Sequence, residues 1–160
     1  GGRVAARYRD TLPGAYQAPT SMFNRISRSL LRFDVAHRST PRWHVQPSRY
    51  AAAIKAKYRR NGFRPTAFQS NSPPLPKWID LEFEVETTVP KPFTVHWQVV
   101  NTGDEAYRAG QLRGDFYDSQ KSGRSRGEST KYRGMHWVEA FVVKDSVCVA
   151  RTGEFVVNIA

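Results

Sequence analysis

Only one cysteine occurs in the sequence, Cys148, so an internal disulfide and a metal site built from several thiolates are both excluded. Cys148 lies in an apolar run, which predicts a buried and unreactive thiol. The absence of disulfides fits a reducing compartment, and we expect the protein to be cytoplasmic. The histidines at positions 37, 44, 96 and 136 lack the spacing of a zinc site. We therefore expect no metal site and no cofactor.

Long apolar runs and catalytic motifs are also missing. No stretch approaches the ~20 apolar residues that cross a bilayer, and the N-terminus lacks the apolar centre of a secretory signal. Neither a Gly-x-Ser-x-Gly elbow nor a glycine-rich phosphate loop occurs. We predict that this chain has no catalytic residues, is not itself an enzyme and has no membrane partner.

Acidic residues are scarce in the first third of the sequence. The 160 residues carry 25 Lys+Arg against 14 Asp+Glu, a net charge of +11, yet residues 1–64 contain only Asp10 and Asp34 as acids. A surface of this kind attracts polyanions such as nucleic acid or nucleotides, or an acidic protein domain. We predict a basic linker or N-terminal extension over residues 1–29, with a helical turn or two at 21–29, and a folded domain over 30–160.

Strict alternation of apolar and polar residues dominates the remainder. The clearest examples predict strands at 79–85 and 93–99, and a hairpin at Lys144-Asp145 between two apolar runs. Further strands are expected at 31–35, 43–45 and 155–159. About eight short strands without a long helix after residue 62 predict an all-β fold, an antiparallel β-sandwich. The final Phe-x-Val-x-Ile is common in immunoglobulin-like domains.

Residues 48–62 are compatible with two structures. Ser48 as N-cap, an alanine-rich middle and Gly62 as C-cap would suit a helix. The same residues also alternate, with Tyr50, Ile54 and Tyr58 on the apolar side. Because the neighbouring segments are strands, we favour a strand, and the helix remains the alternative.

Polar residues collect where the apolar strands between positions 97 and 137 end. Binding loops of β-domains lie at such places, so we predict a ligand pocket there. Its candidate residues are Trp97, Asn101, Arg113, Tyr132, His136 and Trp137. The strand ends do not name the ligand; for a nucleotide-like ligand, Arg113 would pair with a phosphate and Tyr132 or Trp137 would stack on a base. Three simpler interpretations stay open: His136 bonded to backbone at the core edge, Trp97 in the core, and Arg113 in an ion pair with Glu105, Asp115 or Glu128.

The segment 119–131 combines basic residues with serine and glycine and contains no apolar residue. We predict a mobile loop that closes over an anion, or else a solvated hairpin tip. Its candidate phosphate or nucleic-acid contacts are Lys121, Arg124, Arg126 and Lys131.

Several spaced motifs resemble one protein family. They are W-x-V-x-N-x-G-x-x-A from Trp97, L-R-G from Leu112, E-x-T-x-Y-x-G-x-H-x-V-E from Glu128, and C-V-A-R-x-G-E-F-x-V-x-I from Cys148. Together with FDVAHRSTPRW and LPKWIDLEFEV, they resemble the adenylyl/guanylyl cyclase and SMODS C-terminal sensor domain over about residues 30–160. That family accompanies nucleotide second-messenger synthetases in bacterial anti-phage operons.

The resemblance implies a non-catalytic sensor that binds a nucleotide-like or phage-derived ligand. It would regulate a covalently linked nucleotidyltransferase or cyclase in antiviral defence. The sequence is also compatible with two other functions. Its basic charge suits an RNA- or DNA-binding module, with Trp43 or Tyr58 stacking on unpaired bases. Alternatively, the domain is structural and docks on an acidic protein surface.

Overall fold

The computed structural model describes residues 34–46 and 49–160, and the compact unit within them spans His37–Ala160. The predicted basic extension over 1–29, the helical turns at 21–29 and residues 31–33 of the first predicted strand lie outside the described residues. Asp34 and Val35 are not in a strand, so the prediction for 31–35 is wrong in its described part.

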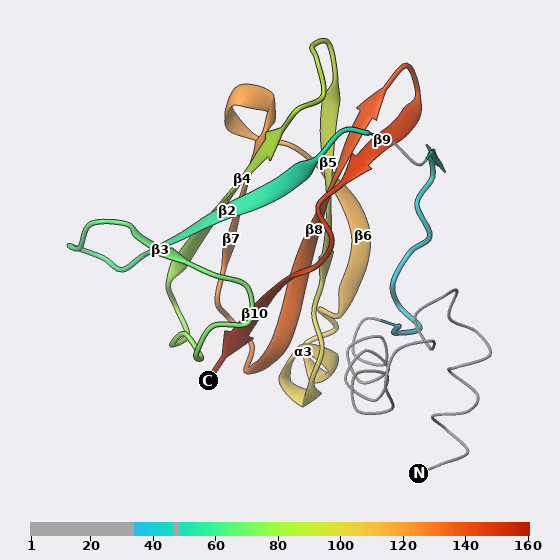
Figure 1. The fold of residues 1–160 in the computed structure, drawn as a ribbon. Coiled ribbons are helices and arrows are strands. Elements are labelled where there is room, and N and C mark those ends of the chain that lie inside the picture. The colour runs from blue at the N-terminus through green and yellow to red at the C-terminus, as the bar shows by residue number, and fades with distance from the viewer. Residues whose placement is uncertain (1–33, 47–48) are drawn as a thin grey trace, which may run out of the picture. The chain divides into compact units, whose positions relative to one another are not determined.

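Two sheets pack face to face (Figure 1). The first sheet has the order β1-β9-β8-β5-β6, with β10 also paired to β8, and the second has the order β3-β2-β4-β7. The first sheet is made of β1 (His44–Val45), β5 (Thr94–Val100), β6 (Arg113–Asp118), β8 (Gly134–Lys144), β9 (Val147–Arg151) and β10 (Phe155–Ile159). The second is made of β2 (Ala52–Arg59), β3 (Thr66–Phe68), β4 (Asp80–Thr87) and β7 (Ser125–Ser129). The predicted all-β sandwich is confirmed.

Alternation in the sequence sets which side chains form the core. Leu81, Phe83 and Val85 of β4 are buried while the acids between them are exposed. They pack against apolar residues of the first sheet, among them Val95, Trp97, Val99, Val138, Ala140 and Val142. The predicted strands at 79–85 and 93–99 are thereby confirmed, with β4 extending to Thr87 and β5 to Val100.

The ambiguous segment 48–62 forms the strand β2. β2 pairs antiparallel with β4, and this register sets Lys55 opposite Glu84 and Lys57 opposite Glu82. Opposite charges on directly facing residues stabilise a sheet, and a helix over the same residues would not form these cross-strand pairs. Pairing with β4 therefore resolves what the local sequence left open.

The hairpin predicted near Lys144 is confirmed, one residue further along. Lys144 pairs with Val147, and the two residues between them have positive φ, 52° at Asp145 and 64° at Ser146. Turns with positive φ at both central residues match the twist of the flanking strands. This turn fixes the register of β8 on β9.

The predicted mobile loop over 119–131 is wrong for its second half. Ser125–Ser129 forms β7, an edge strand on β4, after the short helix η2 (Lys121–Gly123). Gln120 and Ser125 bridge the two ends of η2, and the Gly127 N–H donates to Gln120 Oε1 over 2.9 Å. Backbone pairing holds this strand without an apolar side-chain pattern, so the sequence carried no signal for it.

Residues 37–46, which we call the strap, cover the outer face of the first sheet. Val45 and Trp43 pack on Phe141, Val143 and Cys148, and β1 at its end pairs parallel with β9. β8 is consequently buried on both faces from His136 to Val143. Cys148 is fully buried, as predicted, and burial raises the pKa of its thiol.

Candidate functional site

Arg113 lies at an irregularity between β5 and β6. The register shifts there, since Gln98 pairs with Phe116 and Val100 with Arg113, and both Arg113 and Gly114 have positive φ. A bulge of this kind redirects a side chain at the edge of a sheet. Glycine is required at 114, because a Cβ atom would overlap the His37 carbonyl of the strap.

The redirected guanidinium of Arg113 bridges the two sheets. It binds Glu128 of β7 through two parallel hydrogen bonds of 2.8 and 2.9 Å and donates to the Tyr117 hydroxyl over 3.1 Å. Arg126 donates to the same carboxylate over 3.0 Å. Burial raises the pKa of Glu128, but the hydrogen bonds and charges of the two arginines outweigh it and hold that pKa below its usual value. Of the three predicted ion-pair partners of Arg113, the structure selects Glu128.

A cavity of about 280 Å³ lies beside this ion pair, between the two sheets. Apolar residues of β4, β5, β8 and β10 form part of its wall: Leu81, Phe83, Val99, Val138, Val157 and Ile159. Six of the predicted site residues also line it: Asn101, Arg113, Lys131, Tyr132, His136 and Trp137. The structure thus brings most of the candidates together in one inter-sheet pocket; their contact with a ligand stays a prediction.

Two of these polar residues are already bonded to the backbone. The His136 ring accepts from the Thr102 N–H at Nδ1 over 3.1 Å and donates from Nε2 to the Tyr132 carbonyl over 2.7 Å. These bonds require a neutral ring, and burial lowers the pKa of His136 accordingly. Asn101 donates to the Gln111 carbonyl over 2.8 Å. Both side chains shape the pocket wall, as the simpler interpretation of His136 predicted.

The two tryptophans among the candidates have other surroundings. Trp97 is fully buried in the core and its indole N–H donates to Ser119 Oγ over 2.9 Å, outside the inter-sheet pocket. Trp137 borders the pocket, but alternation along β8 puts its ring on the face that carries Glu139. There the Arg38 guanidinium lies 6.0 Å from the ring centroid. Of the two predicted stacking residues, Tyr132 is therefore the better placed.

The four predicted phosphate contacts are spread over the domain. Lys131 lines the inter-sheet pocket, whereas Lys121 and Arg126 line a second cavity beside β2 and β4. Arg124 lies over the Phe93 ring, with 5.0 Å between its guanidinium carbon and the ring centroid. The structure therefore does not gather these four residues into one anion site.

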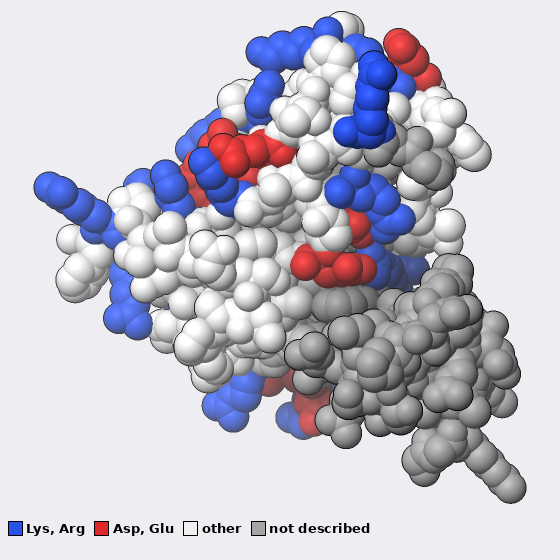
Figure 2. All heavy atoms as spheres, in the orientation of Figure 1, with Lys and Arg blue, Asp and Glu red and all other residues white. Residues whose placement is uncertain are grey.

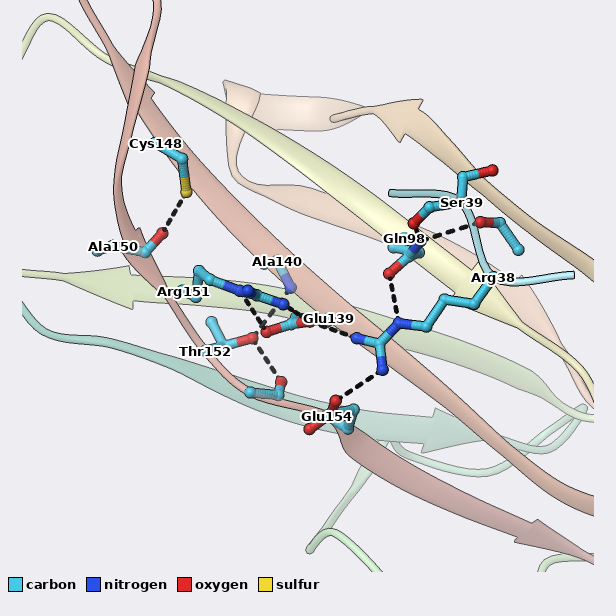
Figure 3. A network of polar contacts seen from close by, with 12 residues as sticks. Arg38, Ser39, Gln98, Glu139, Ala140, Cys148, Ala150, Arg151, Thr152 and Glu154 are labelled. Carbon is cyan, nitrogen blue, oxygen red and sulfur yellow. Dashed lines mark hydrogen bonds and ion pairs between the residues drawn. The ribbon is translucent and has the colours of Figure 1, made fainter. Parts of the chain in front are cut away.

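Sequence reasoning missed a buried ion network behind the pocket (Figure 3). Glu139 of β8 is 2% exposed and pairs with Arg38 of the strap over 2.8 Å and with Arg151 of β9 over 2.9 Å. Arg38 also binds Glu154 over 2.9 Å and donates to the Gln98 side chain over 3.0 Å. A glutamate within the apolar run of residues 135–143 was the signal that could have revealed it, because a buried charge requires partners.

The strap also contacts residues that line the pocket. The His37 ring donates from Nε2 to the Asn101 carbonyl over 2.8 Å. Arg38 lies against Trp137 on the outer face of β8. Residues of the strap therefore touch the back of the inter-sheet wall.

Within residues 34–46 and 49–160, no three His, Cys, Asp or Glu side chains are grouped so that they could hold a metal ion. No helix in these ranges is long and apolar enough to cross a membrane.

Fold and cavity together define a β-sandwich domain with a pocket between its sheets. The family model described as the Adenylyl/Guanylyl and SMODS C-terminal sensor domain matches residues 33–160, and the chain belongs to this family. The resemblance seen in the motifs is confirmed. The family consists of sensor domains associated with nucleotide signalling rather than catalytic domains. A search of curated proteins gave no match.

Proposed function

We propose that this domain senses a nucleotide-like or other anionic ligand in the inter-sheet pocket. It would thereby regulate a covalently linked nucleotide second-messenger synthetase, a nucleotidyltransferase or cyclase, in the cytoplasm during bacterial antiviral defence. One observation carries the proposal: the cavity combines an apolar wall with Asn101, Arg113, Lys131 and Tyr132. Binding sites for small molecules have this composition, with few polar groups on a largely apolar surface.

The cavity volume favours a single small ligand. About 280 Å³ is near the lower end of the range for ligand sites, roughly 300 Å³. A planar base would contact the apolar wall and Tyr132, which supports a nucleotide-like ligand.

Lys131 is the best candidate for the anionic part of the ligand. It is exposed and, among the described residues, has no ion-pair partner. The Arg113 fork is already occupied by Glu128, so a ligand phosphate would have to compete with that carboxylate. We therefore assign the first phosphate contact to Lys131 and a supporting position to Arg113.

Thermal unfolding with a panel of mono-, di- and cyclic nucleotides tests the proposal. A ligand at a hundredfold excess over its Kd stabilises the folded state by about 2.7 kcal/mol. Lys131→Glu should weaken binding at least about tenfold, since a lost charged hydrogen bond costs about 1.5–3 kcal/mol. Its melting point without ligand should change little.

Lys91→Glu is the matched control, because Lys91 is also exposed and lies outside the pocket residues. It makes the same change in net charge and should leave nucleotide binding intact. No stabilisation by any nucleotide, or equal weakening by both substitutions, would contradict the proposal.

A further inference from the structure

The β4–β5 connection and the tip of the β8–β9 hairpin lie at the same end of the sandwich (Figure 1). A third concave surface lies at this end. We call it the hairpin-end groove. It is open, has a volume of about 430 Å³, and shares no residue with the inter-sheet pocket. Its lining includes Trp43 of the strap, Phe93, Thr94, His96, Val143 and Lys144.

Two aromatic rings of the groove each carry an arginine. The Arg42 guanidinium carbon lies 4.6 Å from the Trp43 ring centroid, and that of Arg124 lies 5.0 Å from the Phe93 centroid. Trp43 is held in place by Phe116 and Phe141, whose ring centroids are 5.2 and 6.0 Å away. The groove therefore has two aromatic rings with cations directly on them, and the Trp43 ring is held by its aromatic neighbours.

Neither arginine is neutralised by a carboxylate among the described residues. Arg42 makes a contact of 3.4 Å with His96 Nδ1, and Arg124 is bonded to the sheet through its backbone carbonyl. Lys144 adds a third cation, which is held by the carbonyls of Pro90 and Pro92 at 3.0 and 2.9 Å.

Two acids border the hairpin-end groove. Asp145 lies in the β8–β9 turn, and Asp118 is 85% exposed and bonded to His96 over 3.1 Å. With Lys91 beside Pro92, the cations still outnumber the acids. Figure 2 shows lysine and arginine side chains over this end of the molecule.

We propose that the hairpin-end groove binds single-stranded nucleic acid. Bases would stack on Trp43 and Phe93, while Arg42 and Arg124 turn from the rings to the phosphates. Proteins that bind single strands combine a basic groove with aromatic stacking surfaces in this way. Stacking of a base on a ring exceeds an exposed cation–π contact, so the exchange is favourable.

This site goes beyond the nucleotide pocket, with which it shares no residue. The more open groove suits a chain that continues past it, whereas the smaller pocket between the sheets suits a single small ligand.

The test uses fluorescence anisotropy of the full chain with labelled oligo(dT) and oligo(U) of about 12 nucleotides. Each phosphate contact on a single strand contributes about −0.7 to the slope of log affinity against log salt. Arg42→Gln/Arg124→Gln should reduce the magnitude of that slope by about 1.4 between about 50 and 200 mM salt. Trp43→Phe should remove part of the tryptophan quenching that oligonucleotide binding causes.

Lys131→Glu is the control, since it changes the inter-sheet pocket and leaves the groove intact. Lys57→Glu makes the same change in net charge outside both sites. After correction for that change in charge, the oligonucleotide affinity of Lys131→Glu should match that of the parent chain. An unchanged slope in the double arginine variant would assign binding to other arginines and overturn the proposal. Equal affinity for duplex, or full competition by polyglutamate, would also overturn it. Nucleotide stabilisation with no oligonucleotide binding would leave only the proposed pocket function.

Discussion

At the scale of single residues, Arg113 shows how backbone conformation selects a side chain's partner. Positive φ is uncommon outside glycine, and here it occurs at Arg113 itself, where β6 departs from regular pairing with β5. The guanidinium consequently reaches across the open edge of the sandwich to Glu128 rather than lying along its own strand. Side chains of both residues are at most 20% exposed, so water screens the pair only partly.

Arg113→Ala and Glu128→Gln should each lower the free energy of unfolding by about 1.5–3 kcal/mol, because each leaves a charge without its bidentate partner. The double variant should lose less unfolding free energy than the sum of the two single variants, with a coupling energy of about 0.5–3 kcal/mol. Arg113→Lys should also destabilise, since an ammonium cannot replace the planar fork. Urea unfolding followed by tryptophan fluorescence measures all of these.

The Asp104–Arg108 pair on the short helix α3 (Asp104–Arg108) provides the comparison. Its atoms are 3.9 Å apart and its side chains are 91% and 77% exposed, so the same cycle should give a coupling near zero. Strict additivity at Arg113 and Glu128 would show that the pair is not structural and would return Arg113 to the list of ligand contacts.

At the scale of elements, the strap is held to the first sheet by the buried carboxylate of Glu139. Arg38 meets Glu139, Gln98 and Glu154 on the outer face of the first sheet (Figure 3). A buried carboxylate that loses a partner is strongly destabilising, whereas an exposed ion pair contributes little. This domain contains both kinds of ion pair. Glu139 is a buried carboxylate, whereas Lys55 and Glu86 pair with side chains that are 66% and 57% exposed.

Arg38→Met should therefore lower the free energy of unfolding by about 3 kcal/mol, and Lys55→Met by less than about 1 kcal/mol. Amide hydrogen exchange should rise along β8 and at Asn101 in the Arg38 variant, because the strap contacts both. The strap would lose its assigned role if Arg38→Met unfolded at the same urea concentration as Lys55→Met.

The strands that could be predicted are those whose own sequence shows a local pattern of apolar and polar residues. β4 could be predicted from alternation, since one of its faces lies on the core and the other is exposed. β5 and β10 were found from apolar residues at alternate positions, although both faces of each strand are largely buried. β7 and the strap show no such pattern. β7 is held by backbone pairing with β4 and the strap by the ion network around Glu139, and these partners are distant in sequence. The pocket residues could be predicted because polar side chains gather at strand ends. The bulge that directs Arg113 toward Glu128 could not, because it depends on how β5 pairs with β6.

At the scale of the whole molecule, charge is balanced on one face and in excess at one end. On the exposed face of β2 and β4, Lys57 faces Glu82 and Arg59 faces Asp80, and Figure 2 shows acids and bases interleaved there. That face is consequently a poor site for a polyanion. We expect a polyanion to be attracted instead to the hairpin-end groove, where cations outnumber acids.

Stability should fall with acidification in two pH windows. His136 is held neutral by burial, so its contribution is complete above about pH 6.5 and is lost as pH falls below that value. Glu128 has a lowered pKa in the folded state, so its contribution is complete above about pH 4.3 and is lost as pH falls through the folded value. Unfolding free energies measured across this range should show both steps.

His136→Asn should flatten the upper window and Glu128→Gln the lower one, each leaving the other in place. Both variants will be less stable at neutral pH, so the diagnostic quantity is the slope with pH. An unchanged slope in the corresponding window would assign that step to another residue.

The pairing of β10 with β8 has a consequence for biosynthesis. Val157 and Ile159 form part of the pocket wall, yet they are among the last of the described residues to be synthesised. The strap, made first, must likewise wait for β9 before it can pair. A chain still growing on the ribosome therefore lacks both the rear support and one wall of the pocket. The inter-sheet pocket is therefore complete only after translation has passed β10.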